Sequence, residues 1–377
     1  MTDSASAPTQ ARQLFSTVTQ DGALELDLRD VPVPTPTGDQ LLVRVEATPI
    51  NPSDLAVLLS AADPSGFTAF GASARSPIPE AARRFTAARA GHSLPVGNEG
   101  AGTVIAAGED PAAQALIGKT VAAAGGSFYA QYKLLRAHDC LVLPDGVSAA
   151  EGASSFVNPL TALGMVGTMR REGYRGLVHT AAASNLGQML VKLTQAEGVP
   201  LVCIVRNQAQ ADLLRGLGAT HVVDSTTPDF MGQLIEAIAQ TQAFLAFDAI
   251  GGGKLAGQIL TAMEQAALRT QPANGPYGSS QMKQVYIYGR LSTEPTEIGH
   301  NFGMKWGVGG WLLTPYLQSA GIEEVARMRA RVAAEIRTTF ASAYTARITL
   351  DGAIQPDTIA AYARRATGEK YLIMPNA

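Results

Sequence analysis

Hydrophobic and polar positions alternate along roughly the first 145 residues, with glycine and proline at frequent intervals. Residues 24–28 (Leu-Glu-Leu-Asp-Leu) alternate strictly, and residues 41–47, 118–123 and 127–135 also have the pattern of strands. Residues 66–76 read as a loop, and residues 79–89 as a short alanine-rich helix with proline near its start. Short alternating runs between turn residues predict a barrel-like, all-β domain.

The hydrophobic period lengthens from about residue 149. Helical patterns over residues 155–169, 209–217, 230–239 and 255–266 alternate with apolar runs at 221–224, 244–248 and 284–289. Such alternation predicts a doubly wound, mostly parallel sheet. An edge strand near 306–313, a helix pair (312–318 and 323–340) and strands at 347–350 and 370–374 follow, and we expect the last two to rejoin the first domain. The predicted domains are 1–154 with 313–377, and 155–312.

Residues 176–206 form the centre of this second domain. An apolar run leads into a cluster of small residues, then into a helix with one apolar face, and a second apolar run ends at Arg206. This is a βαβ unit, whose helix N-terminus is suited to a pyrophosphate. Aligned on the glycine fingerprint of dinucleotide-binding folds, the turn reads Ala182-x-Ser184-x-x-Gly187. Only the last glycine is kept, while Ser184 and Asn185 add donors for phosphate oxygens.

Arg206 stands where an NAD-specific fold usually has an acidic residue. A carboxylate would repel a 2′-phosphate, whereas a guanidinium can pair with it, so the position favours NADPH. The alternative is a βαβ unit that binds no nucleotide, with Arg206 a solvated strand end.

Composition and charge restrict the function classes. The chain has 377 residues, long enough for two domains, and 46% of them are hydrophobic. A net charge of −3 and a pI near 6.0 argue against a nucleic-acid or membrane surface as the main partner. Two distant cysteines make a disulfide framework unexpected, and residues 1–10 are expected to be frayed and lack the apolar core of a signal peptide. With no run of membrane-spanning length, we expect a cytoplasmic protein.

Five stretches in order carry a resemblance to a known family. They are residues 50–55 (Ile-Asn-Pro-Ser-Asp-Leu), 97–104 (Gly-Asn-Glu-Gly-Ala-Gly-Thr-Val), 158–163 (Asn-Pro-Leu-Thr-Ala-Leu), 182–187 and 248–252 (Asp-Ala-Ile-Gly-Gly). With residues 288–296, 310–313 and 366–373, the chain resembles the zinc-free branch of the medium-chain dehydrogenase/reductases, which includes quinone oxidoreductases and enoyl-thioester reductases. The resemblance implies an α/β protein with a GroES-like β-barrel domain and a doubly wound Rossmann domain.

The resemblance also implies a site. It places Asn51 beside the nicotinamide ribose, and Asn158 and Thr161 at the nicotinamide end. The implied cofactor-binding residues are Ala182, Ser184, Asn185, Leu186, Gly187, Arg206, Asn207, Asp248, Ile250, Gly251, Tyr288, Gly289, Trp311 and Lys370. Alternatives remain open: Asn51 and Asn158 as turn caps, Tyr288 as a core aromatic, and an uncertain role for Lys370, whose Thr-Gly-Glu-Lys motif has one extra residue.

A zinc site is not expected. Where the zinc branch has histidine before its glutamate this chain has Asn98, the cysteine expected near Asn51 is absent, and five histidines are scattered without ligand spacing. Glu99 then reads as structural, and Asp54 as a turn-stabilising carboxylate. Without a Lewis acid, a quinone or conjugated carbonyl accepts hydride more easily than a simple carbonyl.

The proton donor is the main departure from the family. Enoyl-thioester reductases of this type carry a tyrosine shortly after Asn-Pro-Ser-Asp, but residues 56–94 contain none. A quinone can take its proton from water, which favours quinone-like acceptors; Tyr129 and Tyr132 are possible substitutes but read as packing residues. The insertion at 61–93 is either a surface excursion or a cap whose arginines hold a phosphorylated carrier, which would favour enoyl thioesters.

The sequence therefore predicts an NADPH-dependent, metal-free reductase of a quinone or related conjugated carbonyl. Enoyl-thioester reduction is the alternative. A third reading, a non-catalytic NADPH-sensing or nucleic-acid-binding protein, is opposed by the net charge and by the absence of basic runs. The edge strand at 307–312 predicts a homodimer that continues the sheet across a two-fold axis, as in relatives.

Overall fold

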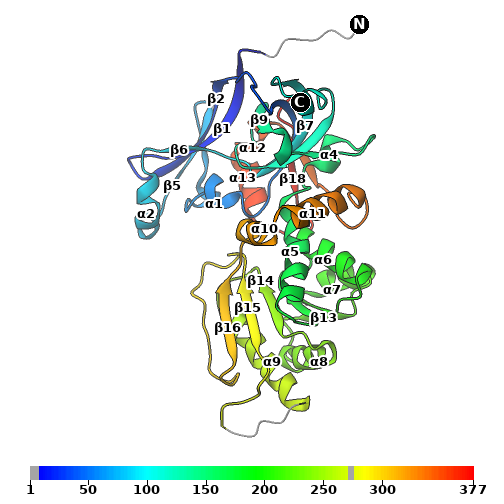
Figure 1. The fold of residues 1–377 in the computed structure, drawn as a ribbon. Coiled ribbons are helices and arrows are strands. Elements are labelled where there is room, and N and C mark those ends of the chain that lie inside the picture. The colour runs from blue at the N-terminus through cyan, green and yellow to red at the C-terminus, as the bar shows by residue number, and fades with distance from the viewer. Residues whose placement is uncertain (1–7, 271–275) are drawn as a thin grey trace. The chain divides into compact units, whose positions relative to one another are not determined.

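The computed structural model describes residues 8–270 and 276–377, which form two compact units (Figure 1). The barrel unit comprises the chain up to Val157 together with Arg329–Ala377, and the Rossmann unit comprises Asn158–Met328. Part of the segment expected to be frayed, residues 1–7, lies outside the described residues. Within the described ranges, no helix is long and apolar enough to cross a membrane.

Two sheets build the barrel unit, in the strand orders β4-β5-β2-β1-β6 and β10-β8-β7-β3-β18-β17, with β9 also paired to β3. The C-terminal strand β18 pairs antiparallel with β3, so the end of the chain lies in the same sheet as a strand near its start. The strands are β1 (Gln10–Val18), β2 (Ala23–Pro32), β3 (Gln40–Pro49), β4 (Thr68–Phe70), β5 (Ser73–Pro77), β6 (Ser93–Pro95), β7 (Glu99–Ala107), β8 (Thr120–Ala124), β9 (Tyr132–Arg136), β10 (Leu141–Val142), β17 (Ala346–Ile348) and β18 (Tyr371–Ile373). The helices are α1 (Leu55–Leu58), α2 (Glu80–Thr86), α3 (Pro111–Gln114), α4 (Ala149–Gly152), α12 (Leu350–Ala353) and α13 (Pro356–Ala363).

The insertion at 61–93 is not a simple loop. Residues 66–76 were expected to be irregular, but they contain β4 and most of β5, and β5 pairs antiparallel with β2. The expected alanine-rich helix is present as α2, with Pro79 as its N-cap residue. The insertion thus extends one sheet of the barrel unit.

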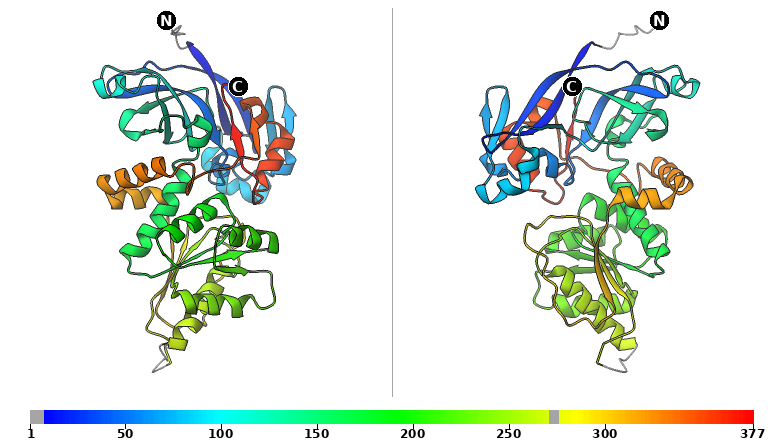
Figure 2. Two further views of the ribbon diagram at one scale, coloured as in Figure 1. Left: turned by 90° about the vertical axis from the view of Figure 1, so that its right-hand side faces the viewer. Right: turned by 60° about the vertical axis from the view of Figure 1, so that its left-hand side comes forward.

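The Rossmann unit has a six-stranded parallel sheet in the order β13-β12-β11-β14-β15-β16 (Figure 2). The strands are β11 (Leu177–His179), β12 (Leu201–Val205), β13 (His221–Asp224), β14 (Leu245–Asp248), β15 (Lys283–Ile287) and β16 (Trp306–Gly310), and the helices are α5 (Val157–Arg171), α6 (Asn185–Ala196), α7 (Gln208–Gly216), α8 (Phe230–Thr241), α9 (Leu255–Thr270) and α10 (Leu313–Ala320). Helix α11 (Ile322–Ala334) begins in this unit, and its residues after Met328 belong to the barrel unit. Apolar residues of α8 and α9 form one core with the strands. The predicted α/β fold class is confirmed.

The second boundary between the units lies at residues 328/329, beyond the expected 312, because α10 packs on α5. A Cβ on Gly167 of α5 would lie 1.9 Å from the Tyr316 hydroxyl, so only glycine admits this ring. Tyr316 also packs against Trp311, with ring centroids 5.8 Å apart. Helix α10 therefore belongs to the Rossmann unit by its packing.

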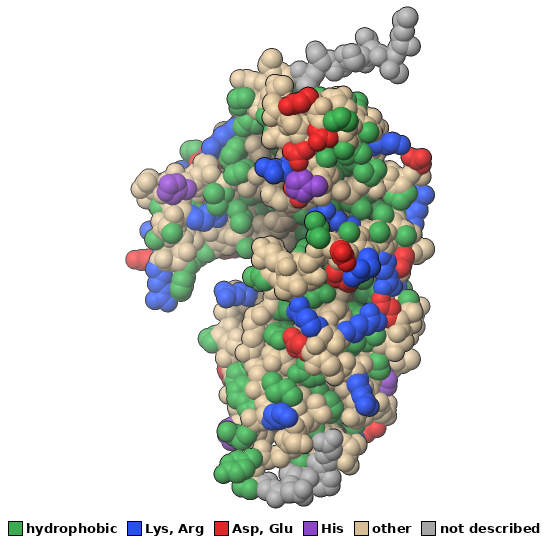
Figure 3. All heavy atoms as spheres, in the orientation of Figure 1, with side chains coloured by type: hydrophobic (Ala, Val, Ile, Leu, Met, Phe, Trp, Pro, Cys, Tyr) green, Lys and Arg blue, Asp and Glu red, His purple; other side chains and the backbone are tan. Residues whose placement is uncertain are grey.

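Charged side chains of both signs are scattered over the face drawn in Figure 3. No continuous basic area is visible on that face. This distribution agrees with the net charge of −3.

Candidate active site

The fingerprint turn joins β11 to α6 in the Rossmann unit. Ser184 has extended backbone geometry and caps α6, its Oγ accepting a hydrogen bond from the Gly187 N–H at 3.2 Å. Ala181 has φ +49°, a left-handed conformation that few non-glycine residues adopt. The turn thus directs the N-terminus of a twelve-residue helix to the carboxyl edge of the sheet, where parallel α/β folds bind ligands.

Gly187 is required by close packing. A Cβ at this position would lie 2.0 Å from the Ala182 carbonyl oxygen and 2.6 Å from its carbonyl carbon. No side chain fits there without moving the helix away from the turn. Gly187 is the one glycine of the fingerprint that this sequence retains, and the close packing at this position excludes any other residue.

Asp248 organises the point where the strand order reverses, between β11 and β14. Its carboxylate is 1% exposed and accepts hydrogen bonds from the Thr180 hydroxyl (2.7 Å), the Ile250 N–H (2.9 Å) and the Gly251 N–H (3.1 Å). Asp248 thus holds the ends of both strands together and positions the loop that follows. Its own side chain is already occupied by protein donors.

Glycines bring the ends of β14 and β15 together. Gly251 has φ +73°, and a Cβ there would lie 2.4 Å from the Gly289 carbonyl oxygen. A Cβ on Gly289 would in turn lie 2.6 Å from the Ala249 carbonyl oxygen. The two loops therefore present backbone, rather than side chains, at the carboxyl edge.

Arg206 lies directly after β12 and is exposed, whereas Asn207 has a clear local role. Asn207 is the N-cap of α7, its side chain accepting from the Gln210 N–H at 2.9 Å. Among the residues that the structure describes, Arg206 forms no side-chain ion pair. Its guanidinium is thus available to an anionic ligand.

Tyr288 pairs with a residue that the sequence did not single out, His179. The Tyr288 hydroxyl lies 2.8 Å from His179 Nε2, and the two rings stack with centroids 5.8 Å apart. Burial lowers the pKa of His179 to about 4, so the imidazole is neutral at pH 7. Trp311 is similarly turned inward, its indole N–H donating to the Thr168 hydroxyl at 3.0 Å. Both aromatic side chains support the sheet from within the unit.

Asn51 belongs to a buried polar cluster of the barrel unit. Its Nδ2 donates to Glu99 Oε1 at 2.8 Å, and its backbone N–H donates to Asp54 Oδ2, also at 2.8 Å. The other oxygen of Asp54 accepts from the Asn98 N–H, so this carboxylate ties two turns together. Asn51 is 2% exposed, yet its Oδ1 has no hydrogen-bond partner within the described structure.

Glu99 also fixes the start of α5. Its Oε2 accepts from the backbone N–H groups of Phe156 (2.9 Å) and Val157 (2.8 Å). Asn158 and Thr161 follow in the first turns of that helix, and Thr161 is 7% exposed. The carboxylate that the zinc branch keeps beside its metal thus serves here as a helix cap.

Lys370 is buried in the same unit. Its ammonium donates to Ser154 Oγ at 2.7 Å, and Ser154 Oγ lies 2.9 Å from the Tyr344 hydroxyl. Burial lowers the pKa of Lys370 to about 8, although Glu99 and Asp54 oppose that shift. Burial also raises the pKa of Asp54 to about 7 and that of Glu99 above its ordinary value. Sequence reasoning missed Ser154 and Tyr344, since only the fold brings these distant positions together.

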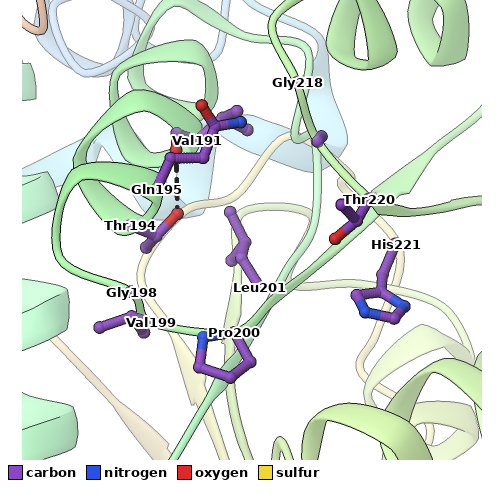
Figure 4. Close-up of a pocket in the computed structure, with 11 residues that line it drawn as sticks. Val191, Thr194, Gln195, Gly198, Val199, Pro200, Leu201, Gly218, Thr220 and His221 are labelled. Atoms are coloured by element: carbon purple, nitrogen blue, oxygen red, sulfur yellow. Dashed lines mark hydrogen bonds between the residues drawn. The ribbon is translucent and has the colours of Figure 1, made fainter.

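A hollow of about 300 Å³ lies in the Rossmann unit beside the amino ends of β12 and β13, lined in part by Gln195, Leu201 and His221 (Figure 4). The Thr194 hydroxyl on its wall already donates to the Leu190 carbonyl, and the Gln195 amide to the Leu217 carbonyl. The fingerprint lies at the opposite, carboxyl edge of the sheet. This hollow is therefore separate from the candidate site.

No three metal-ligating side chains gather anywhere in residues 8–270 and 276–377. Asn98, which stands where the zinc branch has histidine, donates to the Ser53 hydroxyl at 3.0 Å, and Asn51 donates to Glu99. Both amides thus present donor groups to protein neighbours.

A crystal structure of a Mesorhizobium loti protein assigned as an NADPH:quinone reductase is 27% identical, with a TM-score of 0.73 over 98% of this chain and 100% of that one. Escherichia coli quinone oxidoreductase in complex with NADPH is 17% identical, and shares the fold with a TM-score of 0.68 over 97% of this chain and all of that chain.

Two curated proteins of related description are also similar to this chain in sequence. The chloroplastic quinone-oxidoreductase homolog of Spinacia oleracea is 30% identical over 53% of this chain, and the mitochondrial enoyl-[acyl-carrier-protein] reductase of Bos taurus is 25% identical over 66%. The chain spans only 56% and 62% of the lengths of these two relatives. No family model matches the chain. The predicted resemblance to the quinone-oxidoreductase and enoyl-reductase branch of the medium-chain reductases is confirmed.

Proposed function

We propose that this protein is an NADPH-dependent oxidoreductase that transfers hydride, without a metal, to a quinone or related conjugated carbonyl. The main support for this proposal is the carboxyl edge of the Rossmann sheet. The N-terminus of α6, which packs closely at Gly187, lies at this edge, and so does Arg206, whose side chain forms no ion pair within the described residues. The chain's similarity to quinone and enoyl reductases supports the reaction class. We further propose a cytoplasmic location.

The residues present fit NADPH. The N-terminus of α6, with Ser184, Asn185 and Leu186, would hold the pyrophosphate, and Arg206 the 2′-phosphate. The loops carrying Ile250, Gly251 and Gly289 would offer close backbone approach. Ala182, Asn207, Asp248, Tyr288 and Trp311 would support these groups from behind through the contacts described above.

Within the barrel unit, we propose that Asn51 contacts the nicotinamide ribose. The orphaned Oδ1 of Asn51 needs a donor, which a ribose hydroxyl would supply. Asn158 and Thr161 would line the ring, and Lys370, buried as it is, would act on the cofactor's charge from a distance. NADPH, when bound, supplies the hydride; the residues of the chain bind it, orient it and exclude water.

The insertion favours quinones over carrier-linked thioesters. Arg75 pairs with Asp21, and Arg89 donates to the Val57 and Ser16 carbonyls, so neither is free for a carrier phosphate. Arg83 donates to the Ile78 carbonyl. Arg84, stacked 4.6 Å over the exposed ring of Phe85, forms no hydrogen bond or ion pair among the described residues, so its guanidinium is the least committed of the four arginines in the insertion.

The experiment is NADPH oxidation with a panel of quinones, enones and enoyl thioesters as acceptors. We expect quinones to give the highest kcat/KM. If enoyl thioesters lead the panel, and Arg84→Glu but not Arg83→Glu raises their KM, the alternative function holds. Inactivity with all three classes would contradict the proposal.

We also propose a homodimer through β16, the edge strand of the Rossmann sheet. Large apolar side chains are exposed beside this strand: Met304 is 72% exposed, Trp306 37% and Leu312 67%. An unpaired strand edge flanked by such side chains favours pairing with a second copy.

A further inference from the structure

Three side chains from distant segments form a hydrogen-bonded series in the barrel unit, called the proton relay below. Ser154 lies between α4 and α5, Tyr344 precedes β17, and Lys370 precedes β18. The Lys370 ammonium lies 2.7 Å from Ser154 Oγ, which lies 2.9 Å from the Tyr344 hydroxyl. Ser154 is 2% exposed and Lys370 9%, whereas Tyr344 is partly exposed. The proton relay therefore runs from a buried cation toward the surface of the unit.

Chemistry fixes the direction of the hydrogen bond between Lys370 and Ser154, whereas either hydroxyl can donate in the bond between Ser154 and Tyr344. An ammonium can only donate, so Ser154 Oγ accepts from Lys370. The hydroxyl hydrogen of Ser154 is then available for the Tyr344 oxygen. Tyr344 in turn keeps its own hydrogen for an acceptor beyond Ser154, with the Ser342 side chain also in reach of this hydroxyl. An arrangement in which every donor points outward from Lys370 is therefore open to these three groups.

The charges around the proton relay keep a proton on Lys370 near neutral pH. Glu99 of β7 and Asp54 before α1 both favour the ammonium, while burial disfavours it and brings the pKa of Lys370 to about 8. Arg347 of β17 acts on Tyr344 and lowers its pKa slightly against a larger increase from burial. The carboxylate of Glu99 is already bonded to Asn51, Phe156 and Val157, so Ser154 is the hydroxyl that receives the Lys370 proton.

The reduction consumes one proton, which can come from water or from a side chain outside the position where enoyl-thioester reductases carry their tyrosine. No tyrosine stands in residues 56–94. Tyr129, a possible substitute, is fully buried, and its hydroxyl donates to the Pro49 carbonyl at 3.2 Å. Tyr344 differs in that it is partly exposed and has a hydrogen-bonded source of protons behind it.

We propose that Lys370, Ser154 and Tyr344 form the proton supply of the reduction, with Tyr344 delivering the proton to the reduced substrate. This inference rests on the proposed function. Hydride addition leaves the acceptor as an anion; Tyr344 protonates it, Ser154 reprotonates Tyr344, and Lys370 reprotonates Ser154. Lys370, left as a neutral amine, regains a proton from water. One hydride and one proton are thus consumed for each acceptor reduced.

The test compares the variants Tyr344→Phe and Ser154→Ala with the control Tyr371→Phe. Tyr371 lies on β18 and is not one of the three hydrogen-bonded residues. Removal of a general acid typically costs about 10²-fold or more in rate, so we expect kcat to fall by about 10²-fold in the first two variants and to be unchanged in the control. The NADPH dissociation constant, measured by fluorescence, should not change. Ser154→Thr, which restores a hydroxyl, should recover activity.

The pH profile separates a proton supply from a structural role. Wild-type kcat should fall as pH rises through about 8, where Lys370 loses its proton, and should show a solvent deuterium isotope effect. Tyr344→Phe should lose this fall. If Tyr344→Phe and Ser154→Ala keep the wild-type kcat and pH profile, the proton supply is refuted while the reductase function stands. If the wild type fails to oxidise NADPH with every quinone, enone and enoyl thioester tried, the proposed function itself is refuted.

Discussion

The side-chain amide of Asn51 uses only one of its two polar atoms within the described structure. Its Nδ2 is bonded to Glu99, while its Oδ1 is buried without a partner. A buried unsatisfied acceptor costs about 1–3 kcal/mol. A ligand donor would recover this free energy, and the cost is therefore consistent with a binding role.

Replacement of Asn51 tests this role. Asn51→Ala should weaken NADPH binding about 10-fold, the equivalent of one hydrogen bond of about 1.4 kcal/mol. Asn98→Ala, which removes an exposed contact with Ser53, is the matched control and should bind normally. Fluorescence titration with NADPH measures both, and equal affinities for the two variants would show that Asn51 only caps its turn.

His179 makes stability depend on pH. Its pKa is about 4 in the folded protein against an ordinary 6.5, so below pH 6.5 the unfolded chain binds a proton that the folded one does not. Stability is therefore lost as pH falls from 6.5 to 4, by up to about 3 kcal/mol.

Removal of the histidine should abolish that loss. In His179→Leu combined with Tyr288→Phe, both hydrogen-bonding partners are gone, and urea unfolding should show a flatter dependence on pH between 4 and 6.5. Tyr288→Phe alone keeps the titrating group and should retain the wild-type slope. A slope unchanged in the double variant would mean that other groups cause it.

At the scale of elements, the start of α6 carries the strictest steric requirement. Gly187→Ala places a methyl group 2.0 Å from the Ala182 carbonyl oxygen, which should destabilise the protein by about 1–3 kcal/mol and weaken NADPH binding. Gly216→Ala in α7 meets nothing within 4 Å and should stabilise by about 0.5–1 kcal/mol. Thermal unfolding of the two variants checks the contrast, and a destabilised Gly216→Ala with a normal Gly187→Ala would contradict the packing.

Local pattern predicted the elements of the Rossmann unit well, because each strand and helix there carries its own apolar period. It failed at β4 and β5, whose small and polar residues lack alternation and become strands through pairing with β2. The fingerprint turn could be predicted from the position of Gly187, whereas the hydrogen-bond partner of Tyr288 could not be predicted from the sequence. His179 lies 109 residues away, and only the sheet brings the two rings together.

At the scale of the whole molecule, the exposed apolar side chains beside β16 predict self-association. Met304→Glu combined with Leu312→Glu would place charges at this edge and should convert a dimer to a monomer. Val142→Glu, on the exposed β10 of the barrel unit, should leave the dimer intact. Light scattering after gel filtration measures the mass, and a monomeric wild type would exclude this dimer.

The proposed reaction depends on NADPH binding at the carboxyl edge of the Rossmann sheet. The most direct measurement is the ratio of kcat/KM for NADPH over NADH, with a quinone acceptor and chelator-treated protein, in the wild type and in Arg206→Asp. We expect the wild type to prefer NADPH by 10-fold or more, about 1.4 kcal/mol for a charge-assisted contact. In the variant this preference should disappear because kcat/KM for NADPH falls while kcat/KM for NADH stays the same. A ratio near one in the wild type, or equal losses for both cofactors in the variant, would contradict the account.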